Sequence, residues 1–260
     1  MTYSTIILEK KGKIAKITLN RPDSMNAINA VLNRELGEAF DQAKQDTDVD
    51  VIIITGAGRA FCAGLDLKEL GTGTSTLVPP TFPSIWDRIR LCEKPTIAAV
   101  NGVAITGGFE LTLCCDIVIA SENAQFADTH TRVGILPAGG MSQILPRLVG
   151  IKKAKELSFT GNYMNAQEAL QLGLVSRVVP HDDLQTAVEK LANDIISNDQ
   201  VAVRKMKKII DHGEGLPLND AIQYEQFEHI CHLGNQPASE VERRRKSILE
   251  RGRKQVKKGT

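Results

Sequence analysis

The residues best suited to chemistry in this sequence are a pair of adjacent glycines and a glutamate that follows them. Gly107 and Gly108 precede a predicted helix, and Glu110 lies in the first turn of that helix. The backbone N–H groups at the start of a helix have no partner inside it, and the positive end of the helix dipole lies behind them. Such a turn can bind an anion or an oxyanion. Tight packing of the helix against a strand would also explain the two glycines.

Glu110 is surrounded in the sequence by apolar residues, among them Phe109, Leu111 and Leu113. Burying a carboxylate is costly unless the group is paired or used. A carboxylate held beside a ligand can transfer protons as a general acid or base. The alternative is a glutamate on an exposed helix face that interacts only with the helix dipole. Because its neighbours are apolar, we interpret Glu110 as a functional group.

Two further segments could contribute to such a site. Residues 60–68 contain Gly64 among small side chains, so the backbone can turn sharply and direct N–H groups at a ligand. The alternative for this segment is an ordinary turn with Asp66 as a helix N-cap. Residues 126–140 carry His130 between polar and turn-forming residues. This histidine could be catalytic, or it could form a surface network with Asp128.

Strands that alternate with helices must position these segments. A hairpin is predicted at residues 5–19, and buried strands are predicted where β-branched runs occur. This alternation predicts an α/β fold with mostly parallel strands. Beyond residue 182 only helices are predicted, which indicates a second region that starts near residue 200. The predicted strands are residues 51–54, 96–100, 117–120 and 175–179; the helices are 29–44, 83–91, 109–114, 184–196, 201–210, 218–232 and 239–254; a loop is predicted at 71–83.

The composition is that of a globular chain of 260 residues, 42% of them hydrophobic and 24% charged. A net charge of +1 gives no strong overall attraction to nucleic acid or to a membrane surface. The basic residues at positions 243–258 form either a solvated helix face or a local anion-binding patch. Five cysteines without a CxxC pair, and no visible signal segment, predict a cytoplasmic protein. His229 and His232 have no third ligand nearby in the sequence, so no metal site is predicted.

Several motifs occur together in an order that is typical of one family. With these motifs at this spacing, the chain resembles the enoyl-CoA hydratase/isomerase, or crotonase, family over essentially its whole length. The resemblance implies a spiral of ββα units at residues 1–200 that would bind acyl-CoA and perform catalysis. It also implies a helical trimerisation region at residues 201–260, and hence a homotrimer or a dimer of trimers. The motifs are Asn-Arg-Pro at 20–22, Phe-Cys-Ala-Gly-Leu-Asp-Leu at 61–67, Gly-Gly-Phe-Glu-Leu at 107–111, Gly-Ile-Leu-Pro at 134–137 and Ala-Gln-Glu-Ala at 166–169.

The resemblance also implies a set of site residues. The backbone N–H groups of Leu65 and Gly107 would form an oxyanion hole for the thioester oxygen of an acyl-CoA. Coenzyme A would enter as part of the substrate, with no permanently bound cofactor. The residues implied to contact CoA or the acyl group are Met25, Ala27, Ala63, Asp66, Leu67, Lys68, Gly108, Pro137 and Ala138.

One departure from the family pattern affects the predicted reaction. Hydratases of this family use two glutamates; the first matches Glu110, but the second position holds His130, and Ala138 replaces a common glycine. Histidine can perform acid–base chemistry near neutral pH. We therefore expect a hydratase that adds water to a 2-enoyl-CoA, with Glu110 as the main acid–base group and His130, or else Asp128 or a water, as its partner. The alternatives are an enoyl-CoA isomerase or another crotonase-type lyase that uses Glu110 alone, and an acyl-CoA- or RNA-binding protein without turnover.

Overall fold

A computed structural model describes residues 2–72, 83–234 and 237–256. Its largest element is a six-stranded sheet with the strand order β1-β2-β3-β5-β7-β10. β1 is antiparallel to β2, and the other neighbours are parallel. The predicted hairpin and buried strands are confirmed, although the last strand is shorter than predicted. The strands are β1 (Ile6–Lys11), β2 (Ile14–Leu19), β3 (Val51–Gly56), β5 (Thr96–Val100), β7 (Ile117–Ser121) and β10 (Arg177–Val179).

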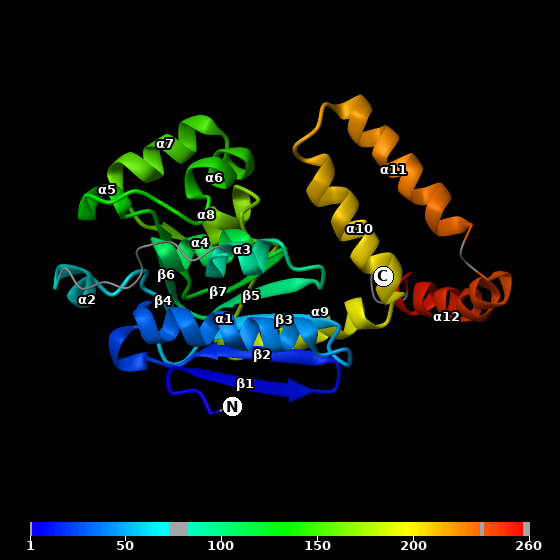
Figure 1. Ribbon diagram of the computed structural model, residues 1–260, viewed down its shortest axis with the longest axis horizontal. Helices are drawn as coiled ribbons and strands as arrows, with labels where there is room; N and C mark the ends of the chain where they lie inside the picture. Colours follow the sequence, from blue (N-terminus) through cyan, green and yellow to red (C-terminus); the bar gives the residue numbers. More distant parts are fainter. Residues whose placement is uncertain (1, 73–82, 235–236, 257–260) are drawn as a thin grey trace. The chain divides into compact units, whose positions relative to one another are not determined.

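Both faces of this sheet are covered, which explains its runs of β-branched residues. Successive side chains of β3 point to opposite faces. Ile52 and Ile54 join the larger hydrophobic cluster with residues of α1 (Ala30–Gln45) and α4 (Gly107–Cys114). Val51 and Ile53 join a second cluster with α9 (Leu184–Ile196) on the other face. The sheet therefore forms the central layer between α1 and α4 on one side and α9 on the other (Figure 1).

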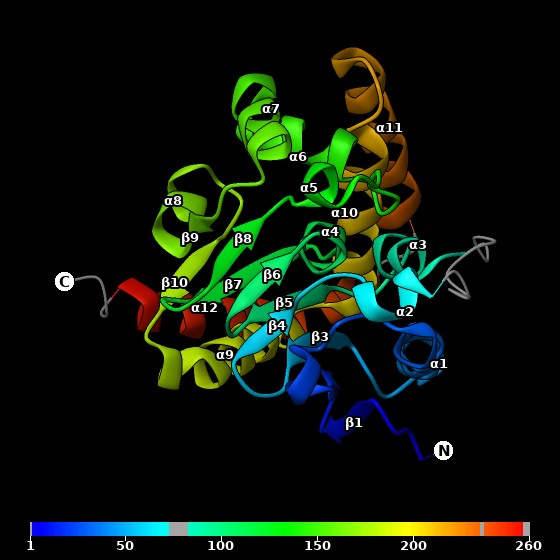
Figure 2. The same cartoon turned by 90° about the vertical axis from the view of Figure 1, so that its left-hand side faces the viewer.

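A second, smaller sheet has the strand order β4-β6-β8-β9. β4, β6 and β8 are parallel neighbours and lie side by side in Figure 2. This sheet was not predicted, because strands of two or three residues are too short to show an alternating pattern. The strands are β4 (Ala60–Cys62), β6 (Val103–Ile105), β8 (Gln125–Ala127) and β9 (Met164–Asn165).

The two sheets are built by a repeated ββα unit. In each repeat, one strand enters the large sheet, the next enters the small sheet, and a helix follows. The fold is therefore the predicted spiral of ββα units. Because β4, β6 and β8 are parallel neighbours, the segments that follow them all emerge at the same edge of the small sheet. The repeats are β3-β4-α2 (Leu67–Gly71), β5-β6-α4 and β7-β8-α5 (His130–Val133).

Shorter helices complete this part of the chain. The N-cap of α1 is Asn29, whose side chain accepts a hydrogen bond from the Leu32 N–H. α3 (Ile85–Arg90) begins with a capping box between Ser84 and Asp87. Most of the predicted loop at 71–83 lies outside the described residues. The remaining elements are α6 (Met141–Val149), α7 (Ile151–Thr160), α8 (Ala166–Gln171) and two 3₁₀ turns, η1 (Pro22–Ser24) and η2 (His181–Asp183).

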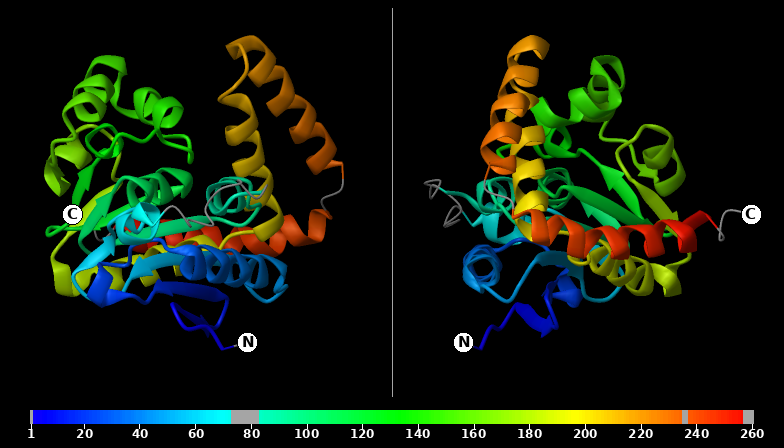
Figure 3. Two further views of the ribbon diagram at one scale, coloured as in Figure 1. Left: turned by 60° about the vertical axis from the view of Figure 1, so that its left-hand side comes forward. Right: turned by 90° about the vertical axis from the view of Figure 1, so that its right-hand side faces the viewer.

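The chain divides into two compact units, Met1–Arg204 and Lys205–Thr260. The second unit contains most of α10 (Gln200–Gly213), α11 (Leu218–Leu233) and α12 (Ala238–Val256), coloured from yellow to red in Figure 3. Within it, Glu228 of α11 accepts hydrogen bonds from Lys205 and Lys208 of α10. No helix in the described ranges has both the length and the apolar content needed to cross a membrane.

Candidate active site

The loops after β4 and β6 are in direct backbone contact. A Cβ atom built on Gly64 would lie 2.8 Å from the Ile105 carbonyl oxygen and 3.3 Å from the Gly107 nitrogen. Gly64 also has φ +89°, a conformation that other residues adopt only with strain. Gly108 packs equally closely, since a Cβ there would lie 2.1 Å from the Cys62 carbonyl oxygen. The glycines therefore allow the two loops to converge.

The two predicted oxyanion donors lie on these converging loops and donate no hydrogen bond within the described part of the chain. On the first loop, the Ile28 N–H donates to the Gly64 oxygen at 2.7 Å, and the Asp66 N–H donates to the Ile28 oxygen at 2.9 Å. The Leu65 N–H between them is left available. Gly107 is the first residue of α4, so its N–H has no acceptor within the helix.

Thr106 holds the turn that presents Gly107. Its φ of 53° lies in the left-handed region, which is unusual for a β-branched residue. The Thr106 N–H donates to the Ala127 oxygen at 2.9 Å, and its hydroxyl is 2.6 Å from the Thr129 hydroxyl. Strained conformations of this kind cluster at functional sites. Thr106 was missed in the sequence because tertiary contacts, rather than residue type, fix its conformation.

Glu110 is 1% exposed and lies one turn behind the two loops. Its Oε1 accepts hydrogen bonds from the Gly139 N–H at 2.6 Å and from the Met141 N–H at 3.4 Å. Its Oε2 lies 3.6 Å from His130 Nε2. The expected burial of Glu110 is thus observed, and the carboxylate is oriented by backbone donors at the start of α6, from Gly139 before it and Met141 at its first position.

His130 and Asp128 are each 3% exposed, so they do not form the surface network considered from the sequence. His130 Nδ1 lies 2.7 Å from Asp128 Oδ1. Burial alone would lower the pKa of His130, but its hydrogen bond to Asp128 and the nearby Glu110 carboxylate raise that pKa to about 9. Burial would raise the pKa of Asp128, but hydrogen bonds from His130 and the Ser158 side chain bring it below its ordinary value. Asp128, His130 and Glu110 therefore form a continuous buried chain.

Most of the predicted CoA contacts lie on two adjacent segments. The Ala63 N–H donates to the Met25 oxygen at 3.0 Å, which places residues 25–28 beside residues 63–66. Asn26 is fully buried, and its side chain donates to the Ala57 and Ala60 oxygens. The structure thus brings Met25 and Ala27 together with Ala63 and the residues that follow it.

Asp66 has a structural role in this region. Its carboxylate accepts hydrogen bonds from the Lys68 and Glu69 N–H groups, so it is the N-cap of α2, as the alternative interpretation expected. It also pairs with Arg21 at 3.0 Å. Leu67 and Lys68 are exposed. The other three predicted contacts lie elsewhere: Gly108 is in α4, and Pro137 and Ala138 directly precede Gly139.

Trp86 of α3 was not singled out from the sequence, although it is the only tryptophan of the chain. Its Nε1–H donates to the Gly107 oxygen at 3.3 Å. A Cβ on Gly139 would lie 2.6 Å from the indole ring, and a Cβ on Gly107 would lie 3.5 Å from it. Trp86 therefore packs between the turn at Gly107 and Gly139, whose N–H donates to Glu110.

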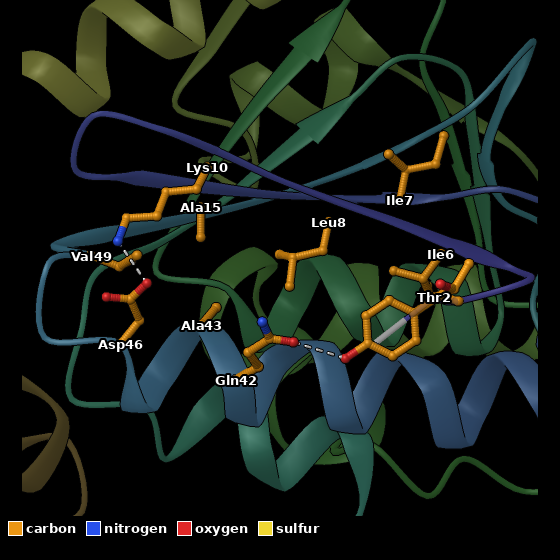
Figure 4. A pocket seen from close by; sticks show the side chains of 11 residues that line it. Thr2, Ile6, Ile7, Leu8, Lys10, Ala15, Gln42, Ala43, Asp46 and Val49 are labelled. Atoms are coloured by element: carbon orange, nitrogen blue, oxygen red, sulfur yellow. Dashed lines mark hydrogen bonds and ion pairs between the residues drawn. The ribbon is translucent and has the colours of Figure 1, made fainter.

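A cavity of 390 Å³ lies elsewhere, between β1 and α1 (Figure 4). Ile6, Leu8, Ala15, Ala43 and Val49 are among its lining residues, and none of the predicted site residues lines it. Among the residues that the structure describes, no group of three or more His, Cys, Asp or Glu side chains could hold a metal ion.

Known proteins resemble this chain in sequence and in fold. A family model described as enoyl-CoA hydratase/isomerase matches residues 9–253. A short-chain-enoyl-CoA hydratase of Clostridium acetobutylicum is 40% identical over 229 residues, which cover 86% of this chain and 88% of that protein. A crotonyl-CoA hydratase of Syntrophomonas wolfei is 40% identical over 230 residues, with coverage of 86% and 88%. The crystal structure of an enoyl-CoA hydratase subunit I from Geobacillus kaustophilus aligns with a TM-score of 0.87 and 33% identity over 96% of both chains.

Proposed function

The chain belongs to the enoyl-CoA hydratase/isomerase family, and we propose that it is a hydratase-like lyase that adds water to a 2-enoyl-CoA. The observation that carries this proposal is the close contact of the loops that bear the available N–H groups of Leu65 and Gly107, together with the buried Glu110 in the first turn of the helix that begins at Gly107. The relatives named as hydratases of enoyl-CoA and crotonyl-CoA support the same reaction.

The two backbone donors would bind the thioester oxygen of the substrate. Attack of water at C3 moves an electron pair onto this oxygen and forms an enolate. Donors that are already in position stabilise this charge without reorganising, and removal of one such donor typically costs about 2.7–4 kcal/mol in catalysis. The glycines that permit the close approach of the two loops are therefore part of the catalytic device.

Glu110 would act as the general base for the attacking water. Its Oε1 is held by the Gly139 and Met141 N–H groups, which leaves Oε2 to accept a proton. His130 lies 3.6 Å from Oε2 and is proposed as the partner that protonates C2. Each such acid–base group contributes about 10²–10⁴ in rate.

The segments at residues 25–27 and 63–68 are proposed to bind coenzyme A as part of the substrate. They are adjacent through the hydrogen bond from Ala63 to Met25, and Asp66 fixes the start of α2. Lys68 is exposed, so its ammonium group is available for a CoA phosphate. Gly108, Pro137 and Ala138 are proposed to contact the acyl end, because they adjoin Gly107 and Gly139.

Residues 201–260 are proposed to assemble the chain into a homotrimer or a dimer of trimers. Large apolar side chains of α10 to α12 support this proposal, since Phe227, Ile230 and Ile248 are each more than 60% exposed within one chain. Sedimentation equilibrium would measure the mass, and a monomer would contradict the proposal. We also propose a cytoplasmic location, which the odd number of cysteines supports and which cell fractionation would test.

The deciding experiment follows the absorbance of the conjugated enoyl thioester. We expect crotonyl-CoA to lose this absorbance as water adds, and Glu110→Gln to abolish the loss. A 3-enoyl-CoA that gains the absorbance instead would identify an isomerase. Binding of acyl-CoA without turnover on substrates of any chain length would refute the enzymatic proposal.

A further inference from the structure

We propose that Asp128 is a positioning residue that holds His130 as a cationic proton donor directed at C2 of the substrate. This inference rests on the proposed hydration reaction. In place of a second glutamate, this site has a histidine with a carboxylate on each side, so its arrangement of charges differs from that of a glutamate pair.

The hydrogen bonds of the segment fix the imidazole ring. Asp128 Oδ1 is 2.7 Å from His130 Nδ1 and also accepts the His130 backbone N–H at 3.3 Å. Because a carboxylate only accepts, Nδ1 must carry a proton. The other ring nitrogen, Nε2, then points at Glu110 Oε2 at 3.6 Å. The hydrogen bond at one nitrogen thus determines what the other can do.

Charge balance requires the cation. Asp128 and Glu110 are 3% and 1% exposed, and buried charges are normally paired. Within the described ranges, neither carboxylate pairs with a lysine or arginine. Arg132, the neighbouring cation on α5, donates to Thr160 and Asn162 instead. On the packed helix α7, Lys152, Lys155 and Glu156 are exposed, and Lys153 pairs with Glu156. Protonated His130 is therefore the cation between the two carboxylates, in agreement with the rise of its pKa to about 9.

The proposed step balances without another reactant. The water oxygen bonds to C3 and its proton goes to Glu110 Oε2, while the C2–C3 π pair becomes the C1–C2 π bond and the carbonyl π pair moves onto the thioester oxygen. The enolate then collapses, and its electron pair takes the proton from His130 Nε2 to form the C2–H bond. The site is left with protonated Glu110 and neutral His130, and transfer of the proton from Oε2 to Nε2 restores the resting state. One water has been added in total.

The test compares Asp128→Asn with the parent by NMR titration of the His130 imidazole, assigned by loss of its signal in His130→Ala. We expect a midpoint near 9 in the parent, and one lower by about 1–3 pH units in the variant, since an opposite charge has been removed. At pH 8, kcat on crotonyl-CoA should fall with the protonated fraction of His130, by about 2-fold for a shift of one unit and about 10²-fold for a shift of three, with little change in KM. Part of that loss should be recovered at acid pH, where His130 protonates without Asp128. Asp48→Asn is the matched control, because its side chain is 80% exposed.

The possible results separate the two proposals. A parent protein whose His130 titrates near 6.5 refutes the inference without any variant, even if hydration is fast. An Asp128→Asn variant whose titration midpoint and pH–rate profile match the parent's also refutes it. A parent that never hydrates an enoyl-CoA refutes the proposed function, whereas the imidazole titration still reports whether Asp128 holds His130 in its charged form.

Discussion

Gly64→Ala should damage catalysis far more than its size suggests. The added methyl group would lie 2.8 Å from the Ile105 oxygen, 2.9 Å from Thr106 Cβ and 3.3 Å from the Gly107 nitrogen. The first two contacts are closer than real Cβ atoms tolerate, so one loop must move. Since these loops carry both proposed oxyanion donors, that shift misplaces at least one N–H group.

The expected size follows from two separable terms. An alanine at φ +89° costs about 1–2 kcal/mol in folding stability, as for other residues forced into this region. Misplacing one oxyanion donor costs about 10²–10³ in kcat. Gly173→Ala isolates the first term, because Gly173 has φ +76° and no neighbour within 4 Å of an added Cβ. Gly64→Ala should lose at least as much conformational stability as Gly173→Ala, because its close contacts add to the backbone strain, but only Gly64→Ala should lose kcat.

The assay is steady-state hydration of crotonyl-CoA, with thermal unfolding measured on the same samples. If Gly64→Ala retained the parent kcat while unfolding at the temperature of Gly173→Ala, the contact with Gly107 would have no catalytic consequence. The proposed oxyanion hole would then be wrong, whatever the other site residues do.

Three further predictions follow from the site. Glu110→Gln should abolish turnover, measured by steady-state kinetics, yet keep acyl-CoA affinity, measured by calorimetry, within a few-fold. A variant that turns over as fast as the parent would remove Glu110 from the mechanism. Hydration should decline as the pH rises through about 9, where His130 loses its proton. The raised pKa of His130 also contributes to the free energy of unfolding, fully below its unfolded pKa of about 6.5, and this contribution is lost as the pH rises through about 9. A hydration rate and an unfolding free energy that do not change over this pH range would contradict the proposed charge of His130. Asn26→Ala should lower stability by about 1–3 kcal/mol, because the half-buried Arg21 N–H and Ala57 oxygen lose their partner and the buried Ala60 oxygen keeps only Asn101. Unchanged denaturant unfolding would show that water replaces the amide.

The large sheet could be predicted because the residue types of its strands indicate that they are buried. Residues 51–54 are uninterrupted β-branched side chains, and such runs indicate burial on both faces. The small sheet gives no comparable signal, since Ala60–Cys62 and Val103–Ile105 are shorter than the window in which a period can be seen. Yet this sheet is the element that gathers the loops of the site.

The candidate site was predictable to different depths. Apolar neighbours alone indicated a buried Glu110. The glycines indicated turns that could direct N–H groups at a ligand, but only the family resemblance assigned this role to Leu65 and Gly107. The Asp128–His130 pair looked like surface polar residues, because a polar stretch after a strand is the usual pattern of an exposed loop. The burial of this pair depends on α7 and α4, which lie in other parts of the sequence. The residue pattern of the segment itself therefore could not predict it.

The charges around position 130 favour a histidine over a glutamate there. A glutamate at 130 would place a third carboxylate beside Asp128 and Glu110, and both of those are already buried. Two like charges in one buried site force one of them to hold a proton, and a third would add repulsion without a cation to relieve it. With histidine, the proton that the reaction must deliver is held by attraction to both carboxylates. Under the proposed mechanism, Asp128 and His130 therefore act as one unit, in which a cation takes the place of the second glutamate and Asp128 is the anion that keeps it charged.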